Sequence, residues 1–307
     1  MKKDIENQPG LVGLCRLKHW DEFIEITENL TDSHKFIWRG QSNSPGDNWE
    51  LVPAFYRNQS YKKFYFFGWA NKLFQSPYFD TLFYHYNFPE KDKFLKLDLL
   101  GRLYVAQHYG IPTCFMDFTW NPLIALYFGM SGVGGTDILK KSDGNLKDYP
   151  ADWMMSIYCI DISRLIDLLG IQASLDVFED FESMGSYLYL KKYLKERSFW
   201  GFDDNPAKRM GSWKHAEKQE SCFLLFDHYI IQKEPPSIDQ TLRKYYPEAI
   251  PDPPIIIYRI PAMSILSDYR NEKMQLFEYL RRKDICGSSL FEDLTGIKYD
   301  LAFQVSF

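Results

Sequence analysis

The stretch that decides the fold runs from residue 102 to residue 130 and reads RLYVAQHYGIPTCFMDFTWNPLIALYFGM. It opens with apolar residues at helical spacing, breaks at a glycine and a proline, and closes with a second apolar segment over 123–128. The polar side chains between the two segments are Thr113, Asp117, Thr119 and Asn121. Unpaired buried donors and acceptors cost about 1–3 kcal/mol each. These side chains therefore need partners, either within a tight turn or in a ligand.

The second apolar segment is expected to be a helix that starts near residue 122. Asn121 stands directly before a proline, which is a favourable N-cap followed by a favourable first helical position. The same helix N-terminus can face an anionic ligand such as a diphosphate. Asp117 can cap this helix or pair with Arg39 or Arg57. We assign Asn121 mainly to capping and Thr119 mainly to the wall of a binding site.

Composition excludes several classes of protein. The chain has 307 residues, is 45% hydrophobic and 17% aromatic, and carries a net charge of −5. These values predict a packed globular protein and argue against one that binds nucleic acid mainly through phosphate contacts. No apolar run approaches the roughly 20 residues that span a bilayer, and the first ten residues do not resemble a secretory signal. The five cysteines are scattered without a CxxC pair. We therefore expect a cytoplasmic protein without a disulfide framework, a metal site or a membrane segment.

The pattern of apolar residues predicts mixed secondary structure. Runs of strand length lie at residues 35–41, 154–160, 221–226 and 255–260. Helices are expected over residues 11–30, 161–169 and 273–282, and an extended segment over 51–57. We interpret the chain as α+β, with an N-terminal helical segment over 1–30 and one domain over 31–307 that carries a helical insertion around 59–100.

Several motifs resemble those of the FRG domain family. Residues 36–41, FIWRGQ, are similar to its F-R-G-Q signature, and residues 51–57 are similar to its L-x-P-S-x-x-R segment. Residues 107–128 resemble its longest motif, QHYGLPTRLLDWTxNPxxALYFA. Residues 219–223 resemble its Q-x-G-x-F element, and residues 273–294 resemble its I-x-x-x-L…LFPDL tail. The resemblance spans most of the chain from Phe36 onward.

Three residues depart from the family pattern. Cys114 stands where the family has an arginine, Phe118 where it has a tryptophan, and Ser221 where it has a glycine. The first departure removes a cation near the expected site and with it some capacity to bind an anion.

The order of the motifs is similar to that of the ADP-ribosyltransferase superfamily. In both, an aromatic-Arg-Gly strand is followed by a Thr/Ser-rich strand with a helix after it, and then by a strand that bears Gln or Glu. This resemblance implies an ADP-ribosyltransferase-like split-sheet core with helical insertions. It also implies a mono-ADP-ribosyltransferase-like effector that uses NAD, in the bacterial toxin or phage-defence contexts with which FRG proteins are associated.

The resemblance also assigns roles to residues of an NAD site. Arg39 would hold the diphosphate side through its guanidinium fork, while Gly40 would let the backbone approach the ligand. Thr113 and Thr119 would line the nicotinamide pocket. His108 is as consistent with a structural hydrogen bond as with an acid, a base or a donor to a ribose. The full set of expected NAD-binding residues is Arg39, Gly40, Gln41, His108, Thr113, Asp117, Thr119 and Asn121.

The catalytic candidates precede the strand at 221–226. Cleavage of the nicotinamide–ribose bond builds positive charge on the sugar, which a nearby carboxylate stabilises. The family motif places Gln219 at this point. Glu217 would share its face of a strand, whereas Glu220 would face the other way. A charged turn before a strand is the alternative interpretation, and the chain would then bind a nucleotide without turning it over.

Two other functions stay open at this point. One is a sensor that recognises a nucleotide or a foreign protein without turnover, and the weaker one is a nuclease built on Asp117, Glu217 and Asp161. The chain has no GxxxxGK[ST], GxGxxG after a strand, HExxH, GxSxG or EF-hand loop, so several common enzyme classes lose their usual support. The acceptor, a protein or a nucleic acid, and the oligomeric state are left open by the sequence.

Overall fold

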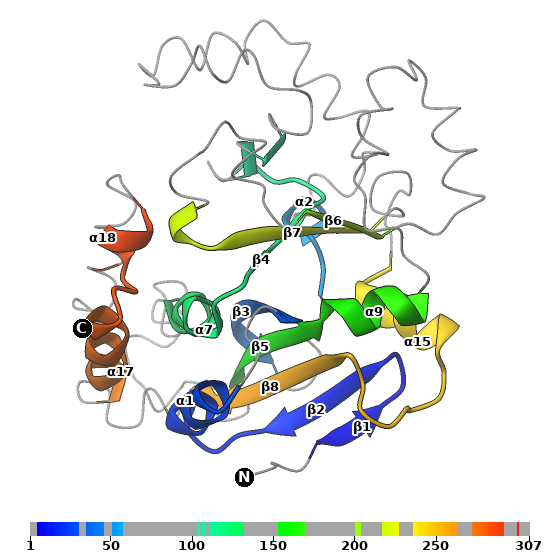
Figure 1. Cartoon of the computed structure of the whole chain (residues 1–307), viewed down its shortest axis with the longest axis horizontal. Helices are drawn as coiled ribbons and strands as arrows, with labels where there is room; N and C mark the ends of the chain where they lie inside the picture. The colour runs from blue at the N-terminus through cyan, green and yellow to red at the C-terminus, as the bar shows by residue number, and fades with distance from the viewer. Residues whose placement is uncertain are drawn as a thin grey trace, which may run out of the picture.

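The fold is built on one central mixed sheet with helices around it. The computed structural model describes residues 5–30, 35–45, 51–57, 103–104, 106–107, 111–131, 153–169, 200–203, 217–226, 236–262, 264, 272–291 and 300. Within these residues the sheet has eight strands in the order β1-β2-β8-β5-β3-β4-β7-β6 (Figure 1). β2 and β8 pair in parallel, and the other neighbours pair antiparallel. The chain is therefore an α+β protein.

The strands come from the whole length of the chain. They are β1 (Glu6–Gln8), β2 (Val12–Arg16), β3 (Phe36–Pro45), β4 (Met116–Thr119), β5 (Trp153–Asp161), β6 (Trp200–Asp203), β7 (Ser221–Phe226) and β8 (Ile255–Pro261). The described helices are α1 (Trp20–Glu28), α2 (Ala54–Arg57), α7 (Pro122–Ser131), α9 (Ile162–Leu169), α15 (Ile238–Tyr245), α17 (Glu272–Arg282) and α18 (Gly287–Leu290). None of these helices has the length and apolar content needed to cross a membrane.

The main core lies between the middle strands and three helices. α7 packs on β3 and β5 and contacts α17, and Figure 1 shows α1 near the same end of the sheet. The largest buried side chains of this core include Phe23, Trp38, Tyr127 and Phe277. Full burial of such a side chain stabilises a fold by roughly 1.5–3 kcal/mol. The core therefore fixes α7 against β3 and sets the position of the polar residues around them.

The other face of the middle strands is polar. Arg39 pairs with Tyr158 across β3 and β5, and Gln41 pairs with Ser156. Residues two apart on a strand share a face, so these four side chains belong to one face and Trp38 to the other. Gln41, Ser156 and Tyr158 are all buried. Ser156 accepts a hydrogen bond of 2.7 Å from Arg259 on β8. A buried polar layer thus lies at the centre of the sheet, next to β4.

β3 and β4 are joined at one point. Trp38 and Thr119 form the one register pair recorded between them in the described residues, whereas β3 and β5 pair along most of their length. In Figure 1, β4 runs from the side of β3 toward β7 and β6. The two strands therefore part beyond this pair, and side chains from both strands surround the space between them.

The prediction of a single helix over residues 11–30 is wrong. Val12–Arg16 forms β2, and the helix begins only at Trp20, with His19 as its N-cap. Pro9 and Gly10 form a turn dipeptide, and φ is positive at Gly10 and at Leu11, so the chain reverses and β1 pairs with β2. Because β2 then pairs with β8, the N-terminal segment contributes strands to the central sheet.

Most of the other expected elements are confirmed. Strands form at all four predicted places, and helices form after Asn121, over 162–169 and over 272–282. In the segment 51–57, expected to be extended, residues 51–53 belong to no helix or strand, and α2 begins at Ala54. The helical insertion expected around 59–100 lies outside the described residues. β6 and α15 had no counterpart in the sequence-based interpretation, although Ser237 and Gln240 form a capping box that marks the start of α15.

Candidate functional site

A cavity of about 470 Å3 lies where β3 and β4 part, and we call it the β3–β4 pocket. Its volume falls within the range of small-molecule and cofactor sites. The described residues that line it are Trp38, Arg39, Gly40, Gln41, Ser42, Arg57, Gln107, Asp117, Phe118, Thr119, Ala125, Phe128, Ser131, Gln219, Ser221, Phe223 and Phe291. The lining combines aromatic rings with amide, guanidinium and carboxylate groups. Five of the predicted NAD-binding residues and one predicted catalytic residue, Gln219, are among them.

Arg39 is the central cation of the pocket. Its Nη1 donates a hydrogen bond of 2.6 Å to the backbone oxygen of Asp117 and lies 3.9 Å from the Asp117 carboxylate. Burial lowers the pKa of the Arg39 guanidinium, while Asp117 and Tyr158 raise it. Its Nε is buried and has no hydrogen-bond partner among the described residues. One edge of the guanidinium therefore holds β4.

Asp117 belongs to a chain of hydrogen bonds that holds it beside Arg39. Gln107 donates its amide to the Asp117 carboxylate, and the Thr113 hydroxyl donates to the Gln107 oxygen. The Asp117 side chain is 54% exposed and opens on the pocket. The surrounding protein partly desolvates the carboxylate and raises its pKa, while Arg39, the hydrogen bond from Gln107, and Arg57 lower it. Asp117 is the one carboxylate among the described residues that line the pocket.

Thr113 does not line the pocket, contrary to expectation. It is fully buried, and its hydroxyl accepts a hydrogen bond from the Phe115 backbone while it donates to Gln107. Both functions of the hydroxyl are thus used inside the protein. Thr113 supports Gln107, which in turn orients Asp117, and its contribution to the site is indirect.

Gly40 lines the pocket, but its missing side chain is required by α7. A Cβ atom at this position would lie 1.8 Å from the backbone oxygen of Ala125 and 2.5 Å from the backbone nitrogen of Gly129. The expectation was that glycine lets the backbone approach a ligand. The geometry shows that it lets helix α7 approach β3, because no side chain fits between their backbones.

Gln41 is the most unusual polar residue of the pocket. It is only 5% exposed, and neither its Nε2 nor its Oε1 has a hydrogen-bond partner among the described residues. Buried amides are almost always paired, because each unmet group costs about 1–3 kcal/mol. The unpaired donor and acceptor on one buried side chain make Gln41 a candidate ligand-binding residue of the pocket.

Thr119 and Gln219 join β4 to the segment before β7. The Thr119 hydroxyl donates to the Gln219 backbone oxygen at 2.7 Å and accepts from the Asn121 backbone nitrogen at 3.1 Å. The Gln219 side chain lines the pocket and donates to the backbone oxygen of Leu290 at 3.3 Å. The Thr119 hydroxyl is therefore committed to the protein, and what Thr119 offers a ligand is the rest of its side chain.

Asn121, Glu217 and Glu220 lie outside the pocket lining. Asn121 accepts a hydrogen bond from the Leu123 backbone at 3.0 Å, which makes it the N-cap of α7, and it donates to Glu220 at 2.9 Å. Glu220 and Glu217 are exposed. Neither glutamate is among the residues that surround the cavity. The expected ribose-directed carboxylate in the segment 217–220 is thus not found at the pocket, and His108 lies outside the described residues.

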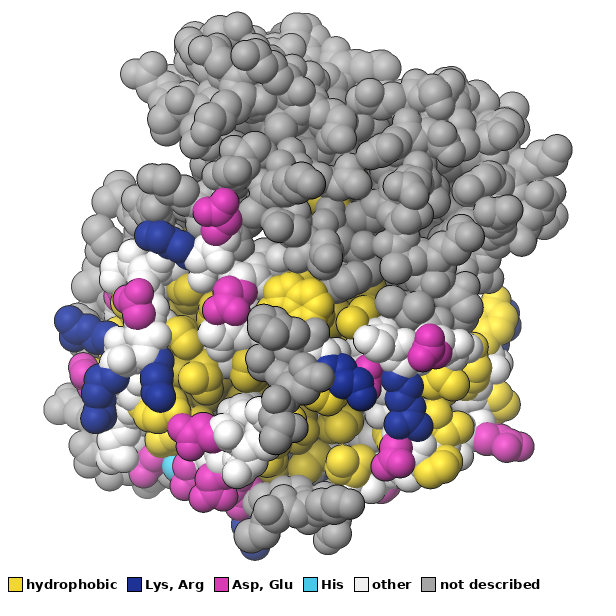
Figure 2. All heavy atoms as spheres, in the orientation of Figure 1, with side chains coloured by type: hydrophobic (Ala, Val, Ile, Leu, Met, Phe, Trp, Pro, Cys, Tyr) yellow, Lys and Arg dark blue, Asp and Glu magenta, His cyan; other side chains and the backbone are white. Residues whose placement is uncertain are grey.

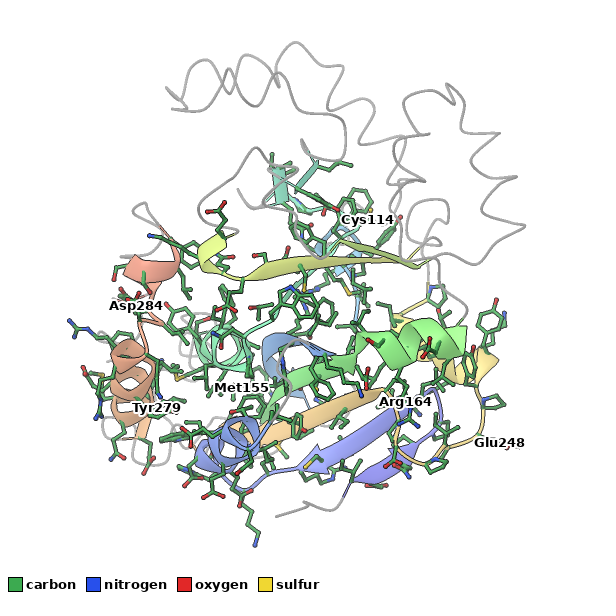
Figure 3. The ribbon with its side chains drawn as sticks, viewed as in Figure 1. Cys114, Met155, Arg164, Glu248, Tyr279 and Asp284 are labelled. Atoms are coloured by element: carbon green, nitrogen blue, oxygen red, sulfur yellow. The ribbon has the colours of Figure 1, made fainter. Side chains whose placement is uncertain are left out.

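Some pocket residues had no place among the predicted site residues. Arg57, Gln107 and the aromatic residues Phe118, Phe223 and Phe291 all line the cavity. Arg57 ends the 51–57 segment that resembles the family pattern, so the motif was a usable signal for it. The aromatic residues carried no signal, because aromatic side chains in strands usually indicate core packing. Cys114, labelled in Figure 3, is buried and does not line the pocket.

The three carboxylates suggested for a nuclease do not lie together in one cavity. Asp117 lines the β3–β4 pocket, whereas Asp161 lines a different cavity and pairs with Lys35 at 2.7 Å. Glu217 lines neither cavity. No group of three or more potential metal ligands was found in the part of the chain that the structure describes.

On the face seen in Figure 2, acidic and basic side chains are interspersed over the described surface.

Comparison with known proteins found one family match. The family model of the FRG domain matches residues 34–135, about a third of the chain. No curated protein and no solved structure matches the chain. The matched residues contain β3, α2, β4 and α7 and therefore most of the pocket lining. The resemblances drawn for residues 219–223 and 273–294 lie outside the match.

Proposed function

We propose that the β3–β4 pocket of this FRG domain protein binds NAD and that the protein is a mono-ADP-ribosyltransferase-like effector. The observation that carries the proposal is that Arg39, Thr119 and Gln219 line one cavity although they come from three separate parts of the chain. These are the three motifs whose order resembles that of the ADP-ribosyltransferases. The parting of β3 and β4 beyond one register pair supports a split-sheet core of the same kind.

The pocket residues fit a dinucleotide by their chemistry. The unpaired Nε of Arg39 and the guanidinium of Arg57 suit phosphate oxygens, because guanidinium groups bind them at close range. The rings of Phe118, Phe223 and Phe291 suit the flat faces of a base or of a nicotinamide. NAD supplies a bond between nicotinamide and ribose whose cleavage leaves positive charge on the sugar.

Asp117 is the residue of the pocket that can stabilise such charge. Its carboxylate opens on the cavity, and the hydrogen bond from Gln107 and the nearby Arg39 hold it in place. Preorganised charges in an enclosed site stabilise developing charge far better than mobile charges in water. In our proposal Asp117 takes the electrostatic role expected of Glu217, while Gln219 borders the same cavity as a neutral hydrogen-bonding group.

The test is incubation of the full chain with labelled NAD and candidate protein and nucleic-acid acceptors. Wild type should release nicotinamide or transfer label. Arg39→Ala and Asp117→Asn should each reduce the rate by about 100-fold or more, since each removes a preorganised charge. Glu217→Ala is the matched control, because Glu217 is exposed and lies outside the pocket, and it should retain activity. Activity that survives both Arg39→Ala and Asp117→Asn contradicts the proposal.

A second candidate function is a nucleotide sensor without turnover. It is favoured by the position of Glu217 and Glu220 outside the pocket and by the engagement of Asp117 with Arg39 and Gln107. A sensor predicts that NAD binds, as measured by calorimetry, and is recovered intact after long incubation. In both versions the protein acts in the cytoplasm, where NAD is available to it.

A further inference from the structure

The side chain of Gln41 stands apart from the other polar groups of the pocket. The Nη1 of Arg39 donates a hydrogen bond to the backbone oxygen of Asp117. The Thr119 hydroxyl both donates and accepts a hydrogen bond within the protein, and the Gln219 amide donates to the backbone oxygen of Leu290. Gln41 offers one donor and one acceptor side by side, and neither has a partner among the described residues. Gln41 is also almost completely buried.

The position of Gln41 is fixed by the sheet. It lies on β3 next to Gly40, whose backbone is held by α7, and it pairs with Ser156 on β5. It shares the polar face with Arg39, two residues earlier. A rigid strand places binding groups more accurately than a loop does. The amide is therefore presented from a fixed backbone position, beside the cation assigned to the phosphates.

A group that pairs with such an amide must present an acceptor and a donor on one edge. Primary carboxamides and the amino edge of adenine both do so, whereas a phosphate or a ribose hydroxyl does not offer the same paired edge. We propose that Gln41 is the specificity residue of the pocket and that its amide forms a paired hydrogen bond with a donor–acceptor edge of the ligand. This inference rests on the proposed function, because NAD carries one such edge at its nicotinamide carboxamide and one at its adenine.

The experiment compares three ligands by calorimetry on the full chain. They are NAD, an analogue with 3-acetylpyridine in place of nicotinamide, and an analogue with purine in place of adenine. Each analogue keeps the acceptor of one edge and lacks its NH2 donor. Wild type should bind one of the analogues about tenfold or more weakly than NAD, because the Gln41 oxygen then loses its partner inside a buried site. The analogue that is rejected identifies the end of NAD that Gln41 contacts.

Two variants separate the halves of the Gln41 amide. Gln41→Met removes both hydrogen-bonding atoms and should bind NAD and the rejected analogue equally. Gln41→Glu has the same shape, keeps an acceptor and loses the donor, so it should bind NAD more weakly yet still reject the same analogue. Gln275→Met, on the exposed side of α17, is the matched control and should behave as wild type.

The outcomes distinguish this inference from the function on which it rests. If wild type binds NAD and Gln41→Met and Gln41→Glu both keep the wild-type preference, Gln41 is not the specificity residue, although the pocket is still an NAD site. If wild type binds both analogues as tightly as NAD, the inference fails in the same way. If wild type does not bind NAD, the proposed function fails and this inference falls with it. Thermal melting of each variant establishes that it is folded.

Discussion

At the scale of single residues, Gly40 shows how closely the fold and the pocket depend on each other. Gly40→Ala places a Cβ atom 1.8 Å from the Ala125 backbone oxygen, and backbone atoms of a helix cannot move away alone. We expect the substitution to lower the free energy of unfolding by about 3 kcal/mol or more. Gly129→Ala is the control, because its nearest neighbour is the flexible Met155 side chain at 2.9 Å. Urea unfolding measures both, and equal losses would contradict this account.

Lys273 gives a prediction about pH at the same scale. It is 2% exposed, and burial lowers its pKa from 10.5 to about 8. Below pH 8 the lysine is charged in both the folded and the unfolded chain, so the cost of burying the charge is fully present. Between pH 8 and 10.5 the unfolded chain binds more protons, and the contribution of Lys273 to stability rises with pH.

Lys273→Met should therefore raise the free energy of unfolding at pH 7, by up to about 3 kcal/mol. The advantage of the variant over wild type should shrink as the pH approaches 10. Lys244→Met, at an exposed position on α15, serves as the comparison and should show no such trend. Denaturant unfolding at pH 7, 8, 9 and 10 provides the measurement. A difference between Lys273→Met and wild type that stays constant over this range would refute the explanation.

At the scale of elements, helix α7 depends on its N-cap. Asn121 accepts from the Leu123 backbone and donates to Glu220, so it ties the start of α7 to the segment before β7. Asn121→Ala removes both bonds and should cost about 1–2 kcal/mol of stability. Asn121→Ser keeps a capping oxygen, is too short to keep the bond to Glu220 and should cost less. Thermal unfolding ranks the two variants, and the reverse order would show that the contact with Glu220 matters more than the cap.

Elements also show what a sequence can reveal about secondary structure. The Asn121-Pro122 junction was predictable, because capping is a local property of the chain. β2 was not predicted. The helical spacing of Trp20, Phe23 and Ile24 was extended toward the N-terminus as far as residue 11, over the residues that form β2. The start of α15 carried a readable capping box that nearby prolines obscured.

At the scale of the whole molecule, β2 couples the N-terminus to the rest of the sheet. Cys15 is buried in the main core and Arg16, its neighbour on β2, is exposed. Cys15→Asp places a charge in the core and should unfold the sheet as a unit, with loss of the proposed NAD binding at the β3–β4 pocket. Arg16→Asp should change the melting temperature by only a few degrees. Circular dichroism and NAD calorimetry on both variants test this, and a Cys15→Asp protein that still binds NAD would show that the pocket is independent of β2.

The candidate site was predictable only where contacts are local or where a motif resembles a family. Arg39, Gln41, Asp117 and Thr119 were found in this way, and they do line one cavity. The absence of Glu217 from the lining of the β3–β4 pocket was not predictable. It depends on where the turn before β7 directs its side chains, and that direction is set by the pairing of β4 with β7 across about 100 residues. Thr113 donates to Gln107, six residues earlier, and does not line the cavity.

The place of β8 between β2 and β5 has a consequence for the order of events during protein synthesis. β8 ends at residue 261, and it is the strand that joins the N-terminal hairpin to the middle of the sheet. A growing chain on the ribosome cannot connect residues 6–16 to β5 until almost the whole sequence has been made. Contacts between residues so far apart form slowly, and strand edges stay open until they do. A chain that ends before residue 255 lacks β8, so β2 has no strand through which it can join β5. Only chains translated through β8 can form the complete sheet.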